Sequence, residues 1–527
     1  MKASNIRRVS QGIFLLLFLY LFLQTESKGK DELGYPVKLF LDFDPLVFVT
    51  TLLSAHSVAK WFFLSLFIIM LTIILGRVFC GWVCPLGTLN NIIGRWEVKS
   101  EKWKTEKKDW NKIKYYILVF LLFSSLFTLQ LVGIMDPISL LIRSLSISIY
   151  PLFNYAIRFF FDTVYLHGGS ISNVTEPIYS ILKKTLLSFQ QPIFSQNLFI
   201  GSIFIGILLL NLSEKRFWCK FLCPLGALLG LFSRYSLLNR KVSEGCNSCN
   251  LCNMVCQGGT NPHKKEEWKK AECIYCLNCD DICPDNAVNF GFFLKGGVRQ
   301  GIDLGRRRVV VSALSGVIAI PLFKVSPFLK AGFSNPVLIR PPGALPEGEF
   351  LKRCVKCGEC MKVCITNGLQ PTLFEAGLEG IWSPMLVPRL GYCEYRCTLC
   401  GQVCPTEAIK RLELSEKVKV KIGLAAIDKN RCLPYAQAID CIVCEEVCPT
   451  PKKAIWFEEA KVRNREGRVR PIKQPVVDLE LCIGCGICET RCPVVDKPAI
   501  YVTSIGESRS NENQILLGGY RGTPKSN

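Results

Sequence analysis

Apolar residues crowd into the first 215 positions, in runs whose length suits a membrane-spanning helix. Residues 61–79, 115–135 and 196–212 are three such runs, and each approaches the roughly 20 residues that a transmembrane helix needs. Residues 12–23 form a shorter run behind a basic start, with no small-residue cleavage site after it. We therefore expect an uncleaved first span rather than a signal peptide, and four spans in this region.

A basic segment sets the expected orientation of these spans. Residues 95–114 are dense in lysine and arginine, and positively charged loops stay in the cytoplasm. Arg234, Arg240 and Lys241 follow the fourth span and belong on the same side. All four spans then agree on one orientation, with both ends of the membrane domain in the cytoplasm.

The sequence around the spans repeats once. The first copy contains FDPLVF and ends in GRVFCGWVCPLG, and the second contains MDPISL and ends in KRFWCKFLCPLG. Because each copy holds two spans, both copies point the same way, related by an axis along the membrane normal. The two CxxxCP motifs should meet at the cytoplasmic ends of their helices. We expect the stretches 45–58 and 137–160 to form interfacial or re-entrant half-helices at the outer face.

A fifth apolar run lies past the middle of the chain, at Gly305–Val325. Arg306, Arg307 and Arg308 lead into about fifteen mostly apolar residues, which is the layout of a signal peptide. Since these arginines belong in the cytoplasm, the run should cross outward. No clear cleavage site follows it, so we expect it to remain as a tether.

These patterns predict a multi-domain chain with an α-helical membrane domain and α+β ferredoxin-like domains. Hydrophobic residues make up 49% of the sequence and the mean hydropathy is +0.27, as in membrane proteins. The net charge is +21, but the basic residues flank apolar runs and no nucleic-acid motif is present, so we expect no nucleic-acid partner. The predicted parts are a membrane domain (1–240), a two-cluster ferredoxin domain (241–300), a tether (301–325), a linker (326–350), a four-cluster domain (351–505) and a flexible tail (506–527).

Cysteine spacing indicates the chemistry. Of 28 cysteines, 24 fall into six groups of four. Most groups are spaced C-x2-C-x2-C-x3-C, the iron–sulfur pattern, whereas zinc prefers separated pairs and disulfide frameworks belong to small secreted chains. We expect six 4Fe–4S clusters. The groups are Cys246, Cys249, Cys252 and Cys256; Cys273, Cys276, Cys279 and Cys283; Cys354, Cys357, Cys360 and Cys364; Cys393, Cys397, Cys400 and Cys404; Cys432, Cys441, Cys444 and Cys448; and Cys482, Cys485, Cys488 and Cys492.

In such proteins the fourth cysteine of one group ligates the cluster of another. In the first domain, Cys283 should complete the cluster of Cys246, Cys249 and Cys252, and Cys256 the cluster of Cys273, Cys276 and Cys279. In the second domain two schemes stay open: the groups exchange ligands first with second and third with fourth, or first with fourth and second with third. Four groups continue into Ala-Val or Ala-Ile, which predicts a turn and a short buried strand. These pairs are Ala287-Val288, Ala408-Ile409, Ala454-Ile455 and Ala499-Ile500.

The remaining cysteines are those of the two CxxxCP motifs: Cys80, Cys84, Cys219 and Cys223. Within each motif the two lie at i, i+4, on one face of a helix. Brought together by the repeat, the four thiols could bind a metal or cycle between dithiol and disulfide. The alternative is that they are buried structural cysteines at a Pro-terminated helix end.

Asp44 and Asp136 occupy matching places in the repeat. Asp-Pro is a common helix start, with Asp as the N-cap, and acids at the outer face could also accept quinol protons. The three histidines are His56, His167 and His263, no CxxCH motif is present, and the two in the membrane domain do not match in the repeat. We expect no haem in this chain.

The repeat motifs with two following ferredoxin motifs resemble the NapH-type membrane subunit of periplasmic nitrate reductase systems. CxxxCP pairs also occur in NosR and CcoG-like proteins. Residues 305–503, with RRRVVV, RPPGALPEGEFLKRC and four cysteine groups, look like the periplasmic polyferredoxins NapG and MauM. The resemblance implies a fusion of the two subunits that passes electrons from the quinone pool, with quinol as substrate, to a periplasmic reductase or cytochrome acceptor.

The implied location is the bacterial inner membrane, with the two-cluster domain cytoplasmic and the four-cluster domain periplasmic. Two other functions stay open. One is electron supply for the maturation of another metalloenzyme, as in the NosR and CcoG relatives. The other is reverse flow to quinone. The sequence leaves about 30 Å of hydrocarbon between the two cluster domains without a cysteine group to bridge it.

Overall fold

The computed structural model describes most of the chain. The described residues are 3–26, 31–34, 37–57, 60–94, 110–167, 172–263, 268–292, 302, 304–324, 335–463, 469–510 and 513–514. Most of the basic segment 95–114, the first part of the linker and most of the tail lie outside them.

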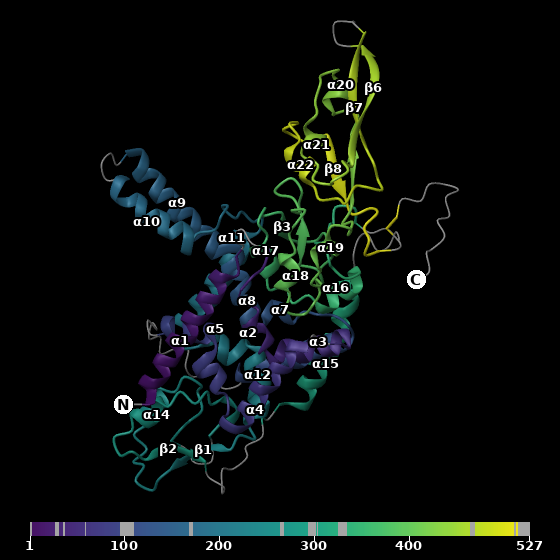
Figure 1. Ribbon diagram of the computed structural model, residues 1–527. Helices are drawn as coiled ribbons and strands as arrows, with labels where there is room; N and C mark the ends of the chain where they lie inside the picture. Colours follow the sequence, from purple (N-terminus) through teal and green to yellow (C-terminus); the bar gives the residue numbers. More distant parts are fainter. Residues whose placement is uncertain are drawn as a thin grey trace.

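A helical body forms the middle of the molecule (Figure 1). Its main helices are α1 (Ala3–Gln24), α3 (Pro45–Ala55), α4 (Leu64–Leu75), α5 (Pro85–Ile93), α6 (Ile113–Leu126), α8 (Pro137–Ser144), α11 (Asn197–Leu209), α12 (Pro224–Ser233) and α15 (Arg306–Lys324). Short helices α2 (Leu39–Asp42) and α7 (Val132–Met135) precede the two Asp-Pro helix starts.

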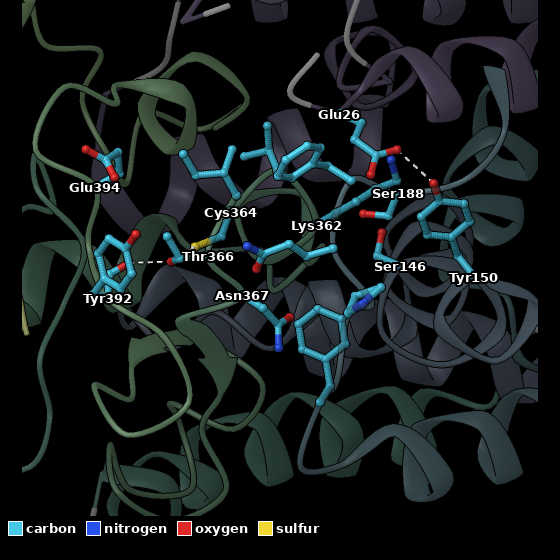
Figure 2. A pocket seen from close by; sticks show the side chains of 16 residues that line it. Glu26, Ser146, Tyr150, Ser188, Lys362, Cys364, Thr366, Asn367, Tyr392 and Glu394 are labelled. Carbon is cyan, nitrogen blue, oxygen red and sulfur yellow. Dashed lines mark hydrogen bonds between the residues drawn. The ribbon is translucent and has the colours of Figure 1, made fainter. Parts of the chain in front are cut away.

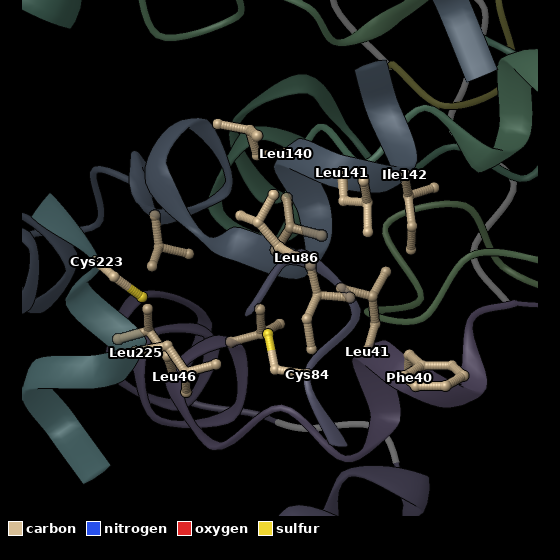
Figure 3. Packing of buried hydrophobic residues seen from close by; sticks show 14 of the residues in the cluster. Phe40, Leu41, Leu46, Cys84, Leu86, Leu140, Leu141, Ile142, Cys223 and Leu225 are labelled. Carbon is tan, nitrogen blue, oxygen red and sulfur yellow. The ribbon is translucent and has the colours of Figure 1, made fainter. Parts of the chain in front are cut away.

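One hydrophobic core fills this body. Figure 3 shows Leu41, Leu46, Leu86, Leu141 and Leu225 packed around the thiols of Cys84 and Cys223. All five leucines are fully buried. The same core continues to Cys276 at one end and Cys357 at the other, so packed side chains connect the two cysteine-rich domains.

Among the residues that the structure describes, two helices are long and apolar enough to cross a membrane. They are Ala3–Gln24 and the continuous helix Pro137–His167. The predicted span at 196–212 is α11 with one further 3-10 turn (Leu210–Leu212). The helices in the two other predicted spans, residues 61–79 and 115–135, are shorter than expected: α4 covers Leu64–Leu75 and α6 covers Ile113–Leu126.

Residues 61–79 and 115–135 are not continuous helices, contrary to the sequence prediction. The first helix stops at Gly76, where φ is +79°, and resumes as a π-helical turn, η2 (Phe79–Val83). The second stops after Leu126, where Thr128 has a φ of +67°, and α7 follows. Hydropathy does not register these breaks because the residues on either side remain apolar.

The stretch 137–160 is not a half-helix either. It belongs to 31 helical residues formed by α8, the π-helical turn η6 (Leu145–Ile149) and α9 (Tyr150–His167). Helix α10 (Ser172–Thr185) packs against α9, with the rings of Phe161 and Tyr179 stacked 4.7 Å apart. The α9–α10 arm leaves the helical body to one side (Figure 1).

The two cysteine-rich domains lie at opposite ends of the helical body (Figure 1). At the start of α1, the backbone N–H of Ser4 donates to Asp281 at 2.8 Å. Just past its other end, the carbonyl of Thr25 accepts from Lys362 at 2.7 Å. Helix α15 runs beside α6, with Gly316 against the carbonyl of Phe120, and joins the two ends.

Pairs of antiparallel strands frame the cysteine loops. Strand β1 (Leu238–Val242) pairs with β2 (Val288–Phe292), and β5 (Leu424–Ile427) pairs with β8 (Ile500–Thr503). Two further antiparallel pairs are formed by segments of the second cysteine-rich domain. They are β3 (Leu369–Pro371) with β4 (Pro384–Leu386), and the hairpin of β6 (Ile455–Arg463) and β7 (Val469–Val477). Three of the four predicted strands begin at the expected residue, Val288, Ile455 or Ile500. Ile409 makes only an isolated bridge to Ala344.

Candidate iron–sulfur centres and the pocket beside them

The structure gathers the cluster cysteines into sets of four. Four small cavities are each lined by three cysteines of one group and the last cysteine of another. These sets are Cys256, Cys273, Cys276 and Cys279; Cys354, Cys357, Cys360 and Cys404; Cys364, Cys393, Cys397 and Cys400; and Cys448, Cys482, Cys485 and Cys488.

The two remaining sets follow from the same exchange. Cys432 lies within electrostatic reach of Cys441 and Cys492. Cys283 packs against the small hydrophobic cluster that contains Cys252, Cys279 and Val288. In the second domain the arrangement is the one in which neighbouring groups exchange ligands. The first domain shows the crossing that its spacing predicts.

The backbone of these loops is built to hold an anion. In four of the six groups, residues one before and one after the second cysteine have positive φ. They are Ser248 and Asn250, Tyr275 and Leu277, Lys356 and Gly358, and Gly484 and Gly486. Alternating left-handed residues turn successive N–H groups toward one side and create a concave anion site. For Tyr275 and Leu277 this conformation is strained, as at many functional sites.

Burial disfavours the charged form of the cysteine thiols. It raises the pKa of Cys393 to about 11 and the pKa of Cys397 to about 12. Iron needs thiolate ligands, so binding a cluster must release these protons. The donor set of four buried or half-buried thiols, in loops that turn their N–H groups inward, fits a 4Fe–4S cluster.

The CxxxCP thiols are buried where the two repeats meet. Each motif forms a π-helical turn, η2 in the first copy and η9 (Trp218–Leu222) in the second. Cys84 then caps α5 and Cys223 caps α12, with Sγ accepting from the N–H of Gly87 at 3.5 Å and of Gly226 at 3.2 Å. Cys84 and Cys223 each interact electrostatically with both Cys80 and Cys219. The four sulfurs therefore lie close together, as the repeat predicts.

Two arginines at equivalent repeat positions flank these thiols. Arg77 and Arg216 are each only 1% exposed. Arg77 donates to the carbonyl of Ala271 at 3.0 Å and to Glu272 at 3.3 Å. Burial alone would raise the pKa of Glu272, but Lys114 and Arg77 lower it below its usual value. A buried charge network therefore joins this site to the two-cluster domain.

Asp44 and Asp136 are fully buried and lie together. Each caps its helix: Asp44 Oδ1 accepts from the N–H of Leu46 at 2.8 Å, and Asp136 Oδ2 from the N–H of Ser139 at 2.7 Å. Their remaining oxygens, Asp44 Oδ2 and Asp136 Oδ1, have no hydrogen-bond partner among the described residues, and the two carboxyl groups lie within electrostatic reach of each other. Two buried carboxyl groups this close favour a proton on one of them. The Asp-Pro pairs predict the caps, but only the fold creates this pair.

A pocket of about 250 Å³ opens between the helical body and the four-cluster domain. Figure 2 shows Glu26 and Tyr150 on one side and Cys364, Thr366 and Tyr392 on the other. Tyr150 Oη donates to Glu26 Oε2 at 2.7 Å. The sequence patterns do not predict this site. The one local feature of the sequence that points to the pocket is Glu26, an acidic residue just after the first apolar run.

Lys362 crosses the pocket between these two sides (Figure 2). Its Nζ lies 4.4 Å from the ring centre of Phe22 and 5.0 Å from that of Tyr150. Burial lowers the pKa of Lys362 to about 8, although the negative charges of Glu26 and Glu359 act to raise it. Cys364, in the wall, belongs to one of the gathered sets of four.

Family models describe the same chemistry. One "4Fe-4S binding domain" model matches residues 59–104 and 196–243, and a second matches residues 475–495. This chain is an iron–sulfur electron-transfer protein. Its similarity to other proteins is spread over its separate parts.

Among the relatives, the ferredoxin-type protein NapG of Escherichia coli is 33% identical over 25% of this chain and 58% of its own. The putative electron transport protein YccM of Escherichia coli is 24% identical over 44% and 55%. An uncharacterized protein of Methanocaldococcus jannaschii is 26% identical over 56% of this chain and 98% of its own. No solved structure matches the chain.

Proposed function

We propose that this chain oxidises quinol in the inner membrane and relays the electrons through up to six 4Fe–4S clusters to a periplasmic acceptor. The observation that carries the proposal is the pocket between the helical body and the four-cluster domain. It combines a carboxylate, a tyrosine and a lysine with Cys364, which lies in the wall. Sites for small molecules are concave, with a few polar groups that fix orientation.

The polar groups suit a quinol headgroup. Oxidation of a quinol releases two electrons and two protons. Glu26 is placed to take a proton, and Tyr150, which donates to it at 2.7 Å, can hold the headgroup oxygen. A cluster held by Cys364, Cys393, Cys397 and Cys400, which line one cavity, would accept the electrons one at a time. Asp44 and Asp136 do not line this pocket, so a role for them in quinol chemistry stays a prediction.

The pocket also has an apolar approach. Tyr150 begins the α9–α10 arm, and Phe189, just after the arm, lines the pocket and is exposed. Phe159, Phe160 and Tyr165 along α9 are exposed as well. Aromatic side chains favour the membrane–water interface, so the arm would lie along the outer surface of the bilayer and open the pocket toward lipid.

The test is cluster reduction by quinol. We expect a menaquinol analogue, added without oxygen to purified full-length chain, to bleach the cluster absorbance. Glu26→Gln and Tyr150→Phe should slow this bleaching at least tenfold, because they remove the proton acceptor or its hydrogen bond. Tyr155→Phe, on the exposed face of the same arm, is the matched control and should leave the rate unchanged.

Dithionite should reduce the clusters of every variant at the same rate, because it does not need the pocket. Clusters that dithionite reduces but quinol does not would overturn the proposal and favour the role in metalloenzyme maturation. Bleaching by quinol that is equally fast in all variants would move the quinol site away from this pocket.

A further inference from the structure

We infer that Arg143 of the helical body sets the reduction potential of the cluster that Cys354, Cys357, Cys360 and Cys404 hold. Arg143 is a positioning residue: it belongs to α8, and its charge makes a cluster of the neighbouring domain easier to reduce. The cluster therefore has its working potential only while the four-cluster domain is docked on the body. The inference does not depend on quinol as the electron donor.

The cysteine loop of this cluster is seated directly on the helical body. Helices α7 and α8 lie at the end of the body that faces the four-cluster domain (Figure 1). A Cβ on Gly133 of α7 would lie 1.7 Å from the carbonyl oxygen of Val355, and a Cβ on Gly358 would lie 3.5 Å from Cα of Arg143. Val355 and Cys357 belong to the hydrophobic core of the body. Contacts this close leave no room for a water layer between the loop and the body.

The guanidinium of Arg143 is held by backbone carbonyls from both sides of this contact. Its Nη1 donates to the carbonyl of Gly133 at 2.8 Å and to the carbonyl of Lys356 at 3.1 Å. Its Nη2 donates to the carbonyl of Ile134 at 3.2 Å. Because Lys356 lies between two of the cluster ligands, the hydrogen bond to its carbonyl fixes the positive charge beside the cluster loop.

This charge is buried and has no carboxylate in contact with it. Arg143 is 2% exposed, and its guanidinium lies 4.4 Å from the ring centre of Trp382, which is itself buried. None of the ion pairs in the described part of the chain includes Arg143. A charge that neither water nor a counterion screens acts strongly over several ångströms, because the dielectric constant of the interior is low.

The effect on the cluster follows from the sign of the charge. Arg143 lies within electrostatic reach of Cys357. Four thiolate ligands bring more negative charge than the iron–sulfide core neutralises, so the cluster is an anion, and reduction adds one more negative charge. A nearby cation stabilises the reduced form most. Net charge is one of the features that set cluster potentials, so Arg143 raises the potential of this cluster.

Other charged side chains surround the same cluster. Lys356 is buried, and its Nζ donates to the carbonyl of Gln130 at 2.6 Å. Glu359 is fully buried and lies within electrostatic reach of Cys357, and Asp136 lies within electrostatic reach of Arg143. All three stay in place when Arg143 is replaced. A substitution of Arg143 therefore isolates the charge that the helical body supplies through this residue.

A redox titration followed by electron paramagnetic resonance tests the inference on the full-length chain, purified without oxygen. The signal that Cys404→Ala removes or alters belongs to this cluster. Arg143→Gln keeps N–H donors but loses the charge. At a given potential it should reduce the fraction of this cluster in the reduced form relative to the oxidised form at least tenfold, a downward shift of about 59 mV or more for one electron.

Two further variants separate charge from shape. Arg143→Lys keeps the charge and should restore the potential to near its value in the unsubstituted chain. Lys324→Gln is the control, because Lys324 is an exposed cation at the same end of the body, where water and salt screen its charge. It should leave every signal at its original potential.

An unchanged potential in Arg143→Gln would overturn the inference. Equal shifts in Arg143→Gln and Arg143→Lys would also overturn it, because the cause would then be the shape of the side chain. A shift confined to a different signal would assign the charge to another cluster and have the same consequence. Iron content equal to that of the unsubstituted chain shows that a variant has assembled its clusters.

Loss of this cluster on substitution is an informative outcome as well. Arg143→Met provides a second neutral variant of similar length. Loss of the cluster in both neutral variants, with retention in Arg143→Lys, would support the inference, because the charge is then needed to hold the anionic cluster. Loss in all three variants would overturn it, because the contact of Arg143 with the loop would then be structural.

Discussion

At the scale of single residues, buried charges mark the places where the chain does more than fold. Arg216 has one hydrogen bond in a buried site, and Asp44 faces Asp136 in another. Both arrangements are costly unless a ligand or a proton is present. Arg340, by contrast, is buried with its partner in place, because its Nε and Nη2 donate to the two carboxylate oxygens of Glu347.

Glu347 provides a pH-dependent stability test away from the clusters. Burial alone would raise its pKa, but Arg340 and Arg509 lower it to about 2. The ion pairs therefore stabilise the fold fully above the unfolded pKa of about 4.5, and this stability is lost as the pH falls toward 2. About a third of the Glu347 side chain is exposed, so solvent screening limits the contribution to about 1 kcal/mol.

We expect Glu347→Gln to lower the free energy of unfolding by that amount at pH 7 and equally at pH 5. The difference from the unsubstituted chain should begin to shrink below pH 4.5. Urea unfolding followed by tryptophan fluorescence measures it. Glu480→Gln, at an exposed position, is the control and should change nothing. A difference that grows as the pH falls would contradict the assignment.

At the scale of elements, the first CxxxCP motif explains why the predicted span at residues 61–79 is broken. Helix α4 must stop before the first CxxxCP motif so that the π-helical turn can direct its thiols inward. Gly76 makes this stop possible. Its φ is +79°, and a Cβ there would lie 2.1 Å from Cε2 of the buried Tyr275 ring. The same ring holds β1, since Tyr275 Oη donates to the carbonyl of Leu238 at 2.9 Å.

Gly76→Ala should therefore destabilise the contact between the helical body and the two-cluster domain. The left-handed backbone alone costs about 1–3 kcal/mol for a residue with a Cβ, and the clash with Tyr275 adds to it. Thermal unfolding and the rate of proteolysis between the two parts should both report the loss. Gly206→Ala is the matched control, because nothing lies within 4 Å of its Cβ position and α11 continues through it. That variant should be neutral or slightly stabilised.

At the scale of the whole molecule, two iron–sulfur domains sit at opposite ends of one helical body (Figure 1). Helix α15 joins these ends and packs along α6, with Lys324 Nζ 2.6 Å from Thr128 Oγ1 at the four-cluster end. If the body crosses the membrane, the two domains lie on opposite sides.

Sidedness can be measured directly. A reporter enzyme active only outside the cytoplasm should be active when fused after residue 350 and inactive when fused after residue 292. A cytoplasmic reporter should give the reverse pattern, because α15 lies between the two fusion points. Equal activity of either reporter at both points would place the two domains on the same side and contradict the proposed topology.

The sequence by itself determined the local chemistry of this protein. Cysteine spacing predicted the iron–sulfur loops and the crossing in the first domain, since a cluster needs several ligands from one short stretch of backbone. Matching motifs predicted the repeat, and the Asp-Pro pairs predicted two helix caps.

Only the tertiary structure decided which distant groups meet. It brought together the four CxxxCP thiols with Arg77 and Arg216, the Asp44–Asp136 pair, and the pocket of Glu26, Tyr150 and Cys364. It also distinguished the two ligand schemes in the four-cluster domain. Local patterns record the preferences of neighbouring residues, whereas these sites depend on packing between segments that are up to hundreds of residues apart. Helix breaks such as the one at Gly76 likewise follow from a ring more than a hundred positions away.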